Sequence, residues 1–215
     1  METKDIIQKS QEWHEIRKGK LTGSCIWKLM GESRSKYEAL SDMAKTYILE
    51  KIAEKHGVEV QNTFTTPAMQ WGNDYEPLAR KWYSKIKDVK VLDIGFIELP
   101  MYEKFAGGSP DGLVEYKNII EIKCPYNPAN HIKHILIELD DFKKEAKEYY
   151  WQMQFYMACL NVEYCDFISF DPRVNADWGL HIKKIDRNEE DIKRMNEKIE
   201  TAIEFMKVVE RKLIS

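Results

Sequence analysis

The chain has 215 residues, of which 43% are hydrophobic and 12% aromatic, so it is long and apolar enough to build a core. No apolar run approaches the ~20 residues that span a bilayer. The first residues also lack the cationic-then-apolar order of a signal peptide, so we expect a cytoplasmic protein without membrane contact. The net charge of −3 argues against coating nucleic acid by bulk charge, but it allows local basic contacts around an acidic metal site.

The first part of the chain has the patterns of helices. Residues 10–30 are expected to form short helices. An apolar stripe at helical spacing predicts a helix over residues 37–56. Thr66 and Pro67 are a typical helix cap and first helical residue, so a third helix is expected over residues 67–86.

The middle of the chain has the alternation of strands, and helical patterns follow it. The expected strands cover residues 89–99, 104–107, 113–116, 119–124, 164–170 and 178–185, and the expected helices cover residues 145–160 and 188–213. This order predicts an α/β (α+β) fold with a central mixed β-sheet flanked by helices. A single domain would then comprise a helical part of about residues 1–86, a sheet core of about 87–185 and a C-terminal helix of about 188–213.

Two carboxylates and a lysine form the most informative pattern. Asp111 lies in a Ser-Pro-Asp-Gly turn, and Glu121 and Lys123 follow on an apolar strand. Residues i and i+2 of a strand face the same side, so Glu121 and Lys123 would point into one pocket. Carboxylates suit Mg²⁺, and a lysine orients or deprotonates a water or stabilises transition-state charge. The pattern resembles the PD-(D/E)XK nucleases; the alternative is a hairpin turn before a solvated edge strand.

Glu76 is a third acid that we expect to approach this pocket. It lies four residues after Gly72 on the same helical face. A glycine inside a helix costs about 1 kcal/mol relative to alanine, which suggests close packing or close backbone approach at Gly72. The alternative is that Glu76 and Arg80 form an ordinary surface pair.

A polar stripe marks the helix over residues 145–160. Gln152 and Tyr156 share one face of this otherwise apolar and aromatic helix, and Gln154 lies between them. Such a stripe would position water or contact DNA, for which Gln154 and Tyr156 are candidates. The alternative is a solvent face, but the apolar residues spread around the helix indicate burial, and buried glutamines need partners.

Arg17, Thr22 and Ser24 surround two glycines near the start of the chain. Thr22 or Ser24 would cap a helix whose N-terminus binds an anion. The forked guanidinium of Arg17 would hold the same phosphate. The alternative is an ordinary helix cap with the arginine in solvent.

Together these segments resemble the lambda-exonuclease-type family of phage recombination nucleases, also called YqaJ-like, within the PD-(D/E)XK superfamily. The resemblance covers roughly residues 13–173. Its motifs run in order as Trp13-His14-x-x-Arg17-x-Gly19, Thr22-x-Ser24, Trp71-Gly72-x-x-Tyr75-Glu76, Ser109-Pro110-Asp111-Gly112-Leu113, Glu121-Ile122-Lys123-Cys124-Pro125, Gln152-x-Gln154-Phe155 and Asp171-Pro172-Arg173.

This resemblance implies a metal-dependent 5′-to-3′ exonuclease that degrades one strand of linear double-stranded DNA to mononucleotides. The product would carry 3′ single-stranded overhangs for recombination by single-strand annealing. The expected partners are linear duplex DNA with a 5′-phosphate, two further copies of the chain in a ring-shaped trimer, and a single-strand annealing protein. The protein would be phage- or prophage-encoded and act in a bacterial host cytoplasm.

The resemblance also implies a role for each site residue. Asp111 and Glu121 would ligate Mg²⁺, or Mn²⁺ in its place, with the backbone carbonyl of Ile122 assisting. Glu76 would join them through water, and Lys123 would activate the attacking water. In addition, Gln152 would help to position that water, and Arg17 and Ser24 would hold the 5′-phosphate.

Other functions remain as alternatives. A RecB-like or restriction-type endonuclease would use the same acids and lysine, and a DNA-end-binding protein would use none of them for catalysis. No iron–sulfur cluster is expected, because only Cys159 and Cys165 lie near each other late in the chain. His131 and His134 lack a nearby acid, so we expect ordinary surface histidines.

Overall fold

The structure is a computed structural model that describes residues 6–58 and 65–214. Its N-terminal part contains α1 (Gln11–Arg17), β1 (Leu21–Thr22), a 3-10 helix η1 (Gly23–Met30), α2 (Asp42–Lys55) and α3 (Pro67–Lys87). The side chain of Thr66 caps α3 as predicted. The helix expected over residues 37–56 begins only at Asp42, because Ser41 caps it.

The strands form two sheets. The larger one has the order β2 (Val91–Leu92), β5 (Gly112–Val114), β6 (Asn118–Lys123), β7 (Tyr164–Phe170) and β8 (Leu180–Asp186). Only its β6–β7 pair is parallel, so the predicted mixed sheet is confirmed. The smaller sheet has the order β1, β4 (Ala106–Gly108) and β3 (Ile97–Glu98). The single strand expected over residues 89–99 is therefore wrong, because its two ends pair in different sheets.

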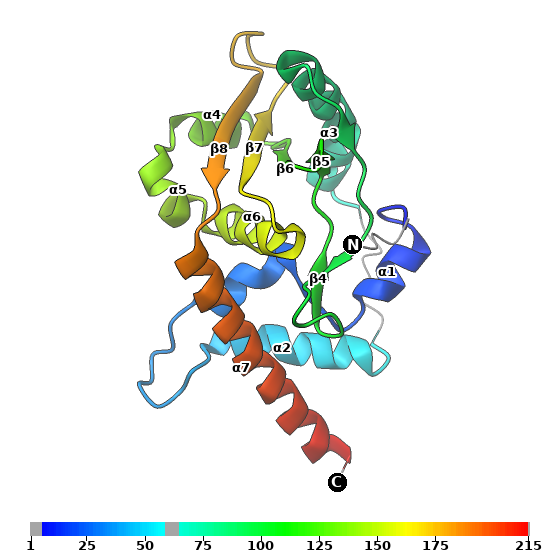
Figure 1. The fold of residues 1–215 in the computed structure, drawn as a ribbon, viewed down its shortest axis with the longest axis vertical. Helices are drawn as coiled ribbons and strands as arrows, with labels where there is room; N and C mark the ends of the chain where they lie inside the picture. Colours follow the sequence, from blue (N-terminus) through cyan, green and yellow to red (C-terminus); the bar gives the residue numbers. More distant parts are fainter. Residues whose placement is uncertain (1–5, 59–64, 215) are drawn as a thin grey trace.

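Helices cover both faces of the larger sheet. On one face, α6 (Lys147–Leu160) and α7 (Glu189–Ile214) pack with α2 and η1 around Ile119, whereas α3 packs on the other face against Ile120 and Ile122. Neighbouring residues of a strand point to opposite faces, so β6 contributes to both layers. In Figure 1, α3 lies at the upper right of the sheet, and α6 and α7 lie below it.

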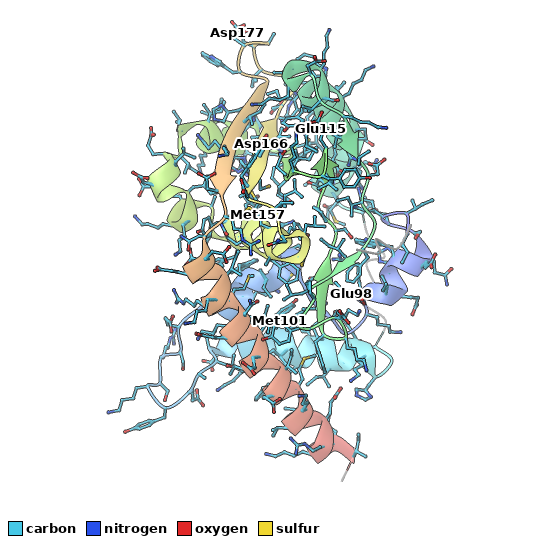
Figure 2. The ribbon with its side chains drawn as sticks, viewed as in Figure 1. Glu98, Met101, Glu115, Met157, Asp166 and Asp177 are labelled. Carbon is cyan, nitrogen blue, oxygen red and sulfur yellow. The ribbon has the colours of Figure 1, made fainter. Side chains whose placement is uncertain are left out.

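Two short helices, α4 (Pro128–Leu136) and α5 (Leu139–Glu145), precede α6 and were not predicted. Asn127 caps α4 through a bond from Ala129 N. The following α6 is buried at ten of its fourteen residues, which confirms the expectation of a mostly buried helix. Figure 2 places Met157 of α6 in the interior and Asp166 on β7. Within the ranges that the structure describes, no helix is long and apolar enough to cross a membrane.

Candidate active site

Asp111, Glu121 and Lys123 lie together where β5 meets β6. Gly112 pairs with Ile120 across these strands, so Asp111 and Glu121 lie opposite each other one residue further on. Lys123 Nζ donates to Glu121 Oε1 at 2.6 Å, and Ile122 N donates to Asp111 Oδ2 at 2.6 Å. The backbone pairing of one hairpin therefore brings together the two acids and the lysine that the sequence singled out.

Burial and mutual repulsion dominate the electrostatics of this pocket. Burial, and then the charge of Glu121, raise the pKa of Asp111 well above its usual value. Burial also raises the pKa of Glu121, although Lys123 opposes the rise. Burial by itself lowers the pKa of Lys123, but the attraction of Glu121 and Asp111 outweighs it and raises that pKa. The lysine is therefore held as an ammonium between two acids.

The donor atoms in this pocket suit a hard divalent cation. Glu121 is 1% exposed, and its buried Oε2 has no hydrogen-bond partner among the residues that the structure describes, although an unpaired buried charge is costly. A cation ligated by Glu121 and Asp111 would satisfy this oxygen and remove the repulsion between the acids. Within the described part of the chain, no three His, Cys, Asp or Glu side chains form a ready-made metal cluster. Mg²⁺ typically binds through one or two carboxylates and keeps several waters.

Glu76 approaches the pocket from α3 on the other side. Its carboxylate lies 3.4 Å from Arg80 and 3.6 Å from Lys9, so the surface pair exists. Its charge nevertheless acts on both acids and contributes to the raised pKa of each. The close approach expected at Gly72 is wrong, because a Cβ there would meet nothing within 4 Å.

Gln152 approaches the pocket from α6. Its side chain is 7% exposed, and its amide opposes the rise in the pKa of Glu121. Its Nε2 donates to Tyr156 Oη at 3.3 Å. The site thus lies between two helices, with Glu76 on one side of the sheet and Gln152 on the other.

The two residues proposed as possible DNA contacts are buried instead. Gln154 is 0% exposed, its Nε2 donates to the Asp186 carbonyl at 2.9 Å, and its Oε1 accepts from Asn188 N at 2.9 Å. It therefore holds the corner between β8 and α7. Tyr156 is 2% exposed, and its ring packs against the glycines of η1 and β4. Both DNA-contact predictions are wrong because α6 is covered on nearly all sides.

Arg17 is a partly buried cation on α1, and its charge acts on Tyr156, as do the charges of Glu121 and Asp111. Its guanidinium lies 4.0 Å from the centre of the Trp13 ring. Burial lowers its pKa, while the nearby Tyr156 opposes that shift. Among the residues in the described ranges, none forms a hydrogen bond or ion pair with this guanidinium. It therefore remains free to bind an anion, and an anion would offset the cost of burial.

Ser24 and Thr22 differ in exposure. Ser24 is exposed at the start of η1. Thr22 is 4% exposed, its N donates to Tyr47 Oη at 2.8 Å, and it makes no side-chain cap. Its side chain is turned into the core, so the structure contradicts Thr22 as a direct phosphate contact and as a side-chain cap.

The expectation that His131 and His134 are surface residues is wrong. They are 0% and 7% exposed, and their Nδ1 atoms lie 2.8 and 2.9 Å from Ser169 Oγ. His131 Nε2 donates to the Trp178 carbonyl at 2.8 Å, so its Nδ1 accepts from the serine when the ring is neutral. The pair fixes α4 to β7, a packing that the sequence analysis did not foresee.

Tyr149 is a site residue that the sequence analysis missed. Its ring centre lies 4.9 Å from Lys123 Nζ, so the ammonium contacts both a carboxylate and an aromatic face. The ring of His134 packs edge-on against Tyr149 at 5.5 Å. Helical spacing in the sequence would have identified Tyr149, because it precedes Gln152 by three residues and therefore shares its helical face.

Comparisons with known proteins show the family and the fold of the chain. Residues 12–163 match the YqaJ-like viral recombinase domain. An alkaline exonuclease from Laribacter hongkongensis (LHK-Exo) is 30% identical, with a TM-score of 0.80 over 95% of this chain and 98% of that chain. Its complex with dAMP has a TM-score of 0.81 over 95% and 96%. A phage-related exonuclease from Haemophilus somnus, 22% identical, shares the fold with a TM-score of 0.73 over 90% and 96%. A search of curated protein sequences found no match.

The fold and the comparisons define the class of the protein as that of the phage-type alkaline exonucleases. The chain belongs to the YqaJ-like viral recombinase family. The expected family and its nuclease fold are thereby confirmed.

Proposed function

We propose that this chain is a metal-dependent 5′-to-3′ exonuclease that degrades one strand of linear double-stranded DNA to mononucleotides and leaves 3′ single-stranded overhangs. The observation that carries the proposal is the buried Glu121 Oε2 beside Asp111, which no atom of the described residues hydrogen-bonds, with Lys123 Nζ 2.6 Å from the other oxygen. Family membership supports it, as does the dAMP complex of the Laribacter enzyme, since dAMP is a nucleoside monophosphate.

Asp111, Glu121 and the Ile122 carbonyl are the residues that would hold Mg²⁺, or Mn²⁺ in its place. When bound, the cation polarises the scissile phosphate, lowers the pKa of a bound water and stabilises the leaving 3′-oxygen. Lys123 serves as a protonated group, because its pKa is raised. Its ammonium orients the attacking water and stabilises negative charge on the phosphate in the transition state.

Gln152 and Glu76 complete the pocket from the two flanking helices. The Gln152 amide lies beside Glu121, where it positions the attacking water. Glu76 acts at longer range and joins the acid cluster through water, since its charge already influences both acids. Because both side chains belong to helices packed on the sheet, their positions are set before DNA binds.

Arg17 and Ser24 hold the 5′-phosphate of the strand being digested. The Arg17 guanidinium is partly buried and stacked on Trp13, so little side-chain freedom is lost when a phosphate binds. Ser24 adds a hydroxyl donor from the exposed start of η1. An end-anchoring arginine next to the acids explains why digestion would begin at a 5′ end.

The remaining parts of the proposal rest on the family resemblance. The chain would assemble as a ring-shaped trimer around duplex DNA, pass its 3′ overhang to a single-strand annealing protein, and act in the cytoplasm of a bacterial host. Such a ring requires a free DNA end, which links assembly to exonuclease rather than endonuclease activity.

The decisive experiment compares a linear duplex labelled at its 5′-phosphorylated end with a covalently closed circle, each with Mg²⁺. We expect the label to be released as mononucleotide and the circle to stay intact. Cutting of the circle would instead establish the endonuclease alternative. A protein that binds linear ends without cleaving them would establish the end-binding alternative.

The 5′-phosphate contact has its own test in Arg17→Ala. This variant should lose most of the preference for 5′-phosphorylated over 5′-hydroxyl ends, while its rate on hydroxyl ends stays close to that of the wild type. Lys18→Ala is the matched control, because its side chain is exposed beside Arg17. Equal wild-type rates on the two ends would refute the anchoring role.

A further inference from the structure

Four side chains form a stack beside the acids. Trp71 and Tyr75 come from α3, with ring centres 4.1 Å apart. The Arg173 guanidinium, from the loop after β7, lies 4.0 Å from the centre of the Trp71 ring. Tyr126, from the segment after β6, packs edge-on against Trp71 at 6.1 Å. We call these four residues the aromatic platform.

Arg173 is held rigidly in this stack. Its Nε and Nη2 donate to the two oxygens of Asp171 at 2.8 and 2.7 Å. Nη2 also donates to the carbonyls of Tyr126 and Pro125, at 2.9 and 3.3 Å. Asp171 is fully buried. These contacts fix the start of the loop whose far end carries Asp177 in Figure 2, so the platform is preformed rather than assembled on binding.

The platform adjoins the proposed catalytic pocket. Tyr75 directly precedes Glu76, and Tyr126 follows Lys123 by three residues. Cys124 lies between Lys123 and Tyr126 in the chain, and the charges of Glu76, Asp111 and Asp171 all act on its thiol. A strand with its phosphate at the acids would therefore have neighbouring bases within reach of the platform.

If the four residues served only to hold the loop in place, the contacts of Arg173 would be explained. Two other observations would not. Tyr126 is 52% exposed, so its ring presents an aromatic surface to solvent. The Trp71 Nε1 hydrogen is buried and has no acceptor among the residues that the structure describes. An exposed ring and an unpaired indole donor are features of a surface that binds a partner with both a flat face and acceptor atoms.

We propose that the aromatic platform binds an unpaired nucleobase of the DNA substrate by stacking. The inference rests on the proposed nuclease function and adds a site for the base next to the cleaved phosphate. Every base has a π-face, so stacking suits an enzyme that must accept any sequence. Arg173 adds a guanidinium plane whose Nη1 is not used by the contacts described above, and it can donate to a base or phosphate.

The test measures DNA affinity by fluorescence anisotropy, with Ca²⁺ in place of Mg²⁺ to suppress cleavage. The probe is a duplex with three unpaired nucleotides at a 5′-phosphorylated end. Tyr126→Ala should weaken binding between about 5-fold and about 100-fold, the range for loss of one stacked base. Tyr126→Phe should stay within about 2-fold of wild type, because it keeps the ring. Tyr37→Ala is the matched control, since Tyr37 is 86% exposed in the segment before α2.

Abasic nucleotides then identify the strand. One probe lacks the unpaired bases of the 5′-phosphorylated strand, and a second carries its unpaired, abasic nucleotides on the opposite strand. Removal of the bases from one of the two strands should weaken wild-type binding as much as Tyr126→Ala does. On that same probe, Tyr126→Ala should have no lower affinity than the wild type, because the stacked base is already absent. Two results would overturn base stacking on the platform: wild-type affinity in Tyr126→Ala, or, on both probes, affinity losses from the substitution and from base removal that multiply. Neither result would conflict with cleavage of linear DNA by the wild type. Failure of the wild type to bind DNA would overturn the proposed function as well.

Discussion

Asp111 and Glu121 carry charges that the protein alone does not balance. Lys123 pairs with one oxygen of Glu121, and Asp111 accepts from one backbone N–H. Within residues 6–58 and 65–214, Glu121 Oε2 has no hydrogen-bond partner. Burial raises the pKa of both acids. A cofactor of opposite charge is the simplest physical reason to keep such an arrangement, because repulsive and desolvated acids are otherwise costly.

We predict that Asp111→Asn stabilises the metal-free protein and abolishes cleavage. A raised acid pKa means that the folded state binds more protons than the unfolded state, so stability falls as pH rises above the unfolded pKa of about 4. Removing one acid should therefore increase the free energy of unfolding at pH 8, and by less at pH 5. Thermal unfolding in EDTA at both pH values tests this; a lower melting temperature than wild type at pH 8 would contradict it.

Lys123→Ala should lower kcat by at least about 100-fold, because the transition-state charge and the attacking water lose their ammonium. Glu121 would also lose its ion-pair partner, so the metal-free variant should melt at a lower temperature than wild type. Mg²⁺ should restore part of that loss. Single-turnover cleavage and thermal unfolding with and without Mg²⁺ provide the two readouts, and full activity in the purified variant would exclude the catalytic role of Lys123.

At the scale of elements, α6 is the scaffold of the site. Tyr149, Gln152 and Tyr156 follow one helical face and contact Lys123, Glu121 and the glycine backbone respectively. At Gly108 a Cβ would lie 2.5 Å from Tyr156 Cε1. The position of α6 therefore depends on the absence of a side chain at Gly108, opposite Tyr156.

Gly108→Ala should destabilise the protein by about 1–3 kcal/mol, because the added methyl overpacks the contact with Tyr156. Displacement of α6 would also move Gln152 and lower kcat. The matched control is Gly72→Ala in α3, where an added Cβ has no described atom within 4 Å. This substitution should stabilise the helix by about 0.5–1 kcal/mol. Urea unfolding of the two variants should thus give shifts of opposite sign.

His134, which fixes α4 to β7, predicts a second pH dependence of the free energy of unfolding. Burial, and then repulsion from His131, lower the pKa of His134 to about 4. The folded state therefore binds fewer protons than the unfolded state between about pH 6.5 and about pH 4. Up to about 3 kcal/mol of stability is present above this window and is lost as pH falls through it. Unfolding of His134→Gln should show a shallower pH slope in this window, whereas the exposed His14→Gln should keep the wild-type slope.

At the scale of the whole molecule, the acids lie between two helical layers. Glu76 acts on Glu121 from α3 and Gln152 does so from α6, so residues far apart in the chain act on one carboxylate. The core around α6 likewise draws on η1, α2 and α7. Truncation of any of these elements would disturb the site through packing.

The proposed ring makes a prediction about mass. Sedimentation equilibrium should give three times the 25.5 kDa of one chain, and the trimer should digest long linear DNA without dissociating. Addition of an excess of unlabelled DNA after the start of the reaction should leave the digestion rate of bound DNA unchanged. A monomer at micromolar concentration would contradict the ring, although it would leave the chemistry of Asp111 and Glu121 untouched.

The sequence by itself determined the family, the fold class and most of the elements. Asp111, Glu121 and Lys123 were recognisable because a short hairpin joins them, and local spacing is enough to specify a hairpin face. Thr66 and Pro67 marked the start of α3 because capping is a local property of the chain. The family followed from the order of these motifs, which requires no knowledge of packing.

Only the tertiary structure decided which polar side chains reach the site. Gln152 and Gln154 are two residues apart on a helix buried nearly all round, yet one faces Glu121 and the other holds the β8–α7 corner. Periodicity assigns residues to helical faces but cannot say what covers each face of a fully buried helix. The burial of His131 depends likewise on α4 packing against β7, a contact between distant segments that no local pattern encodes.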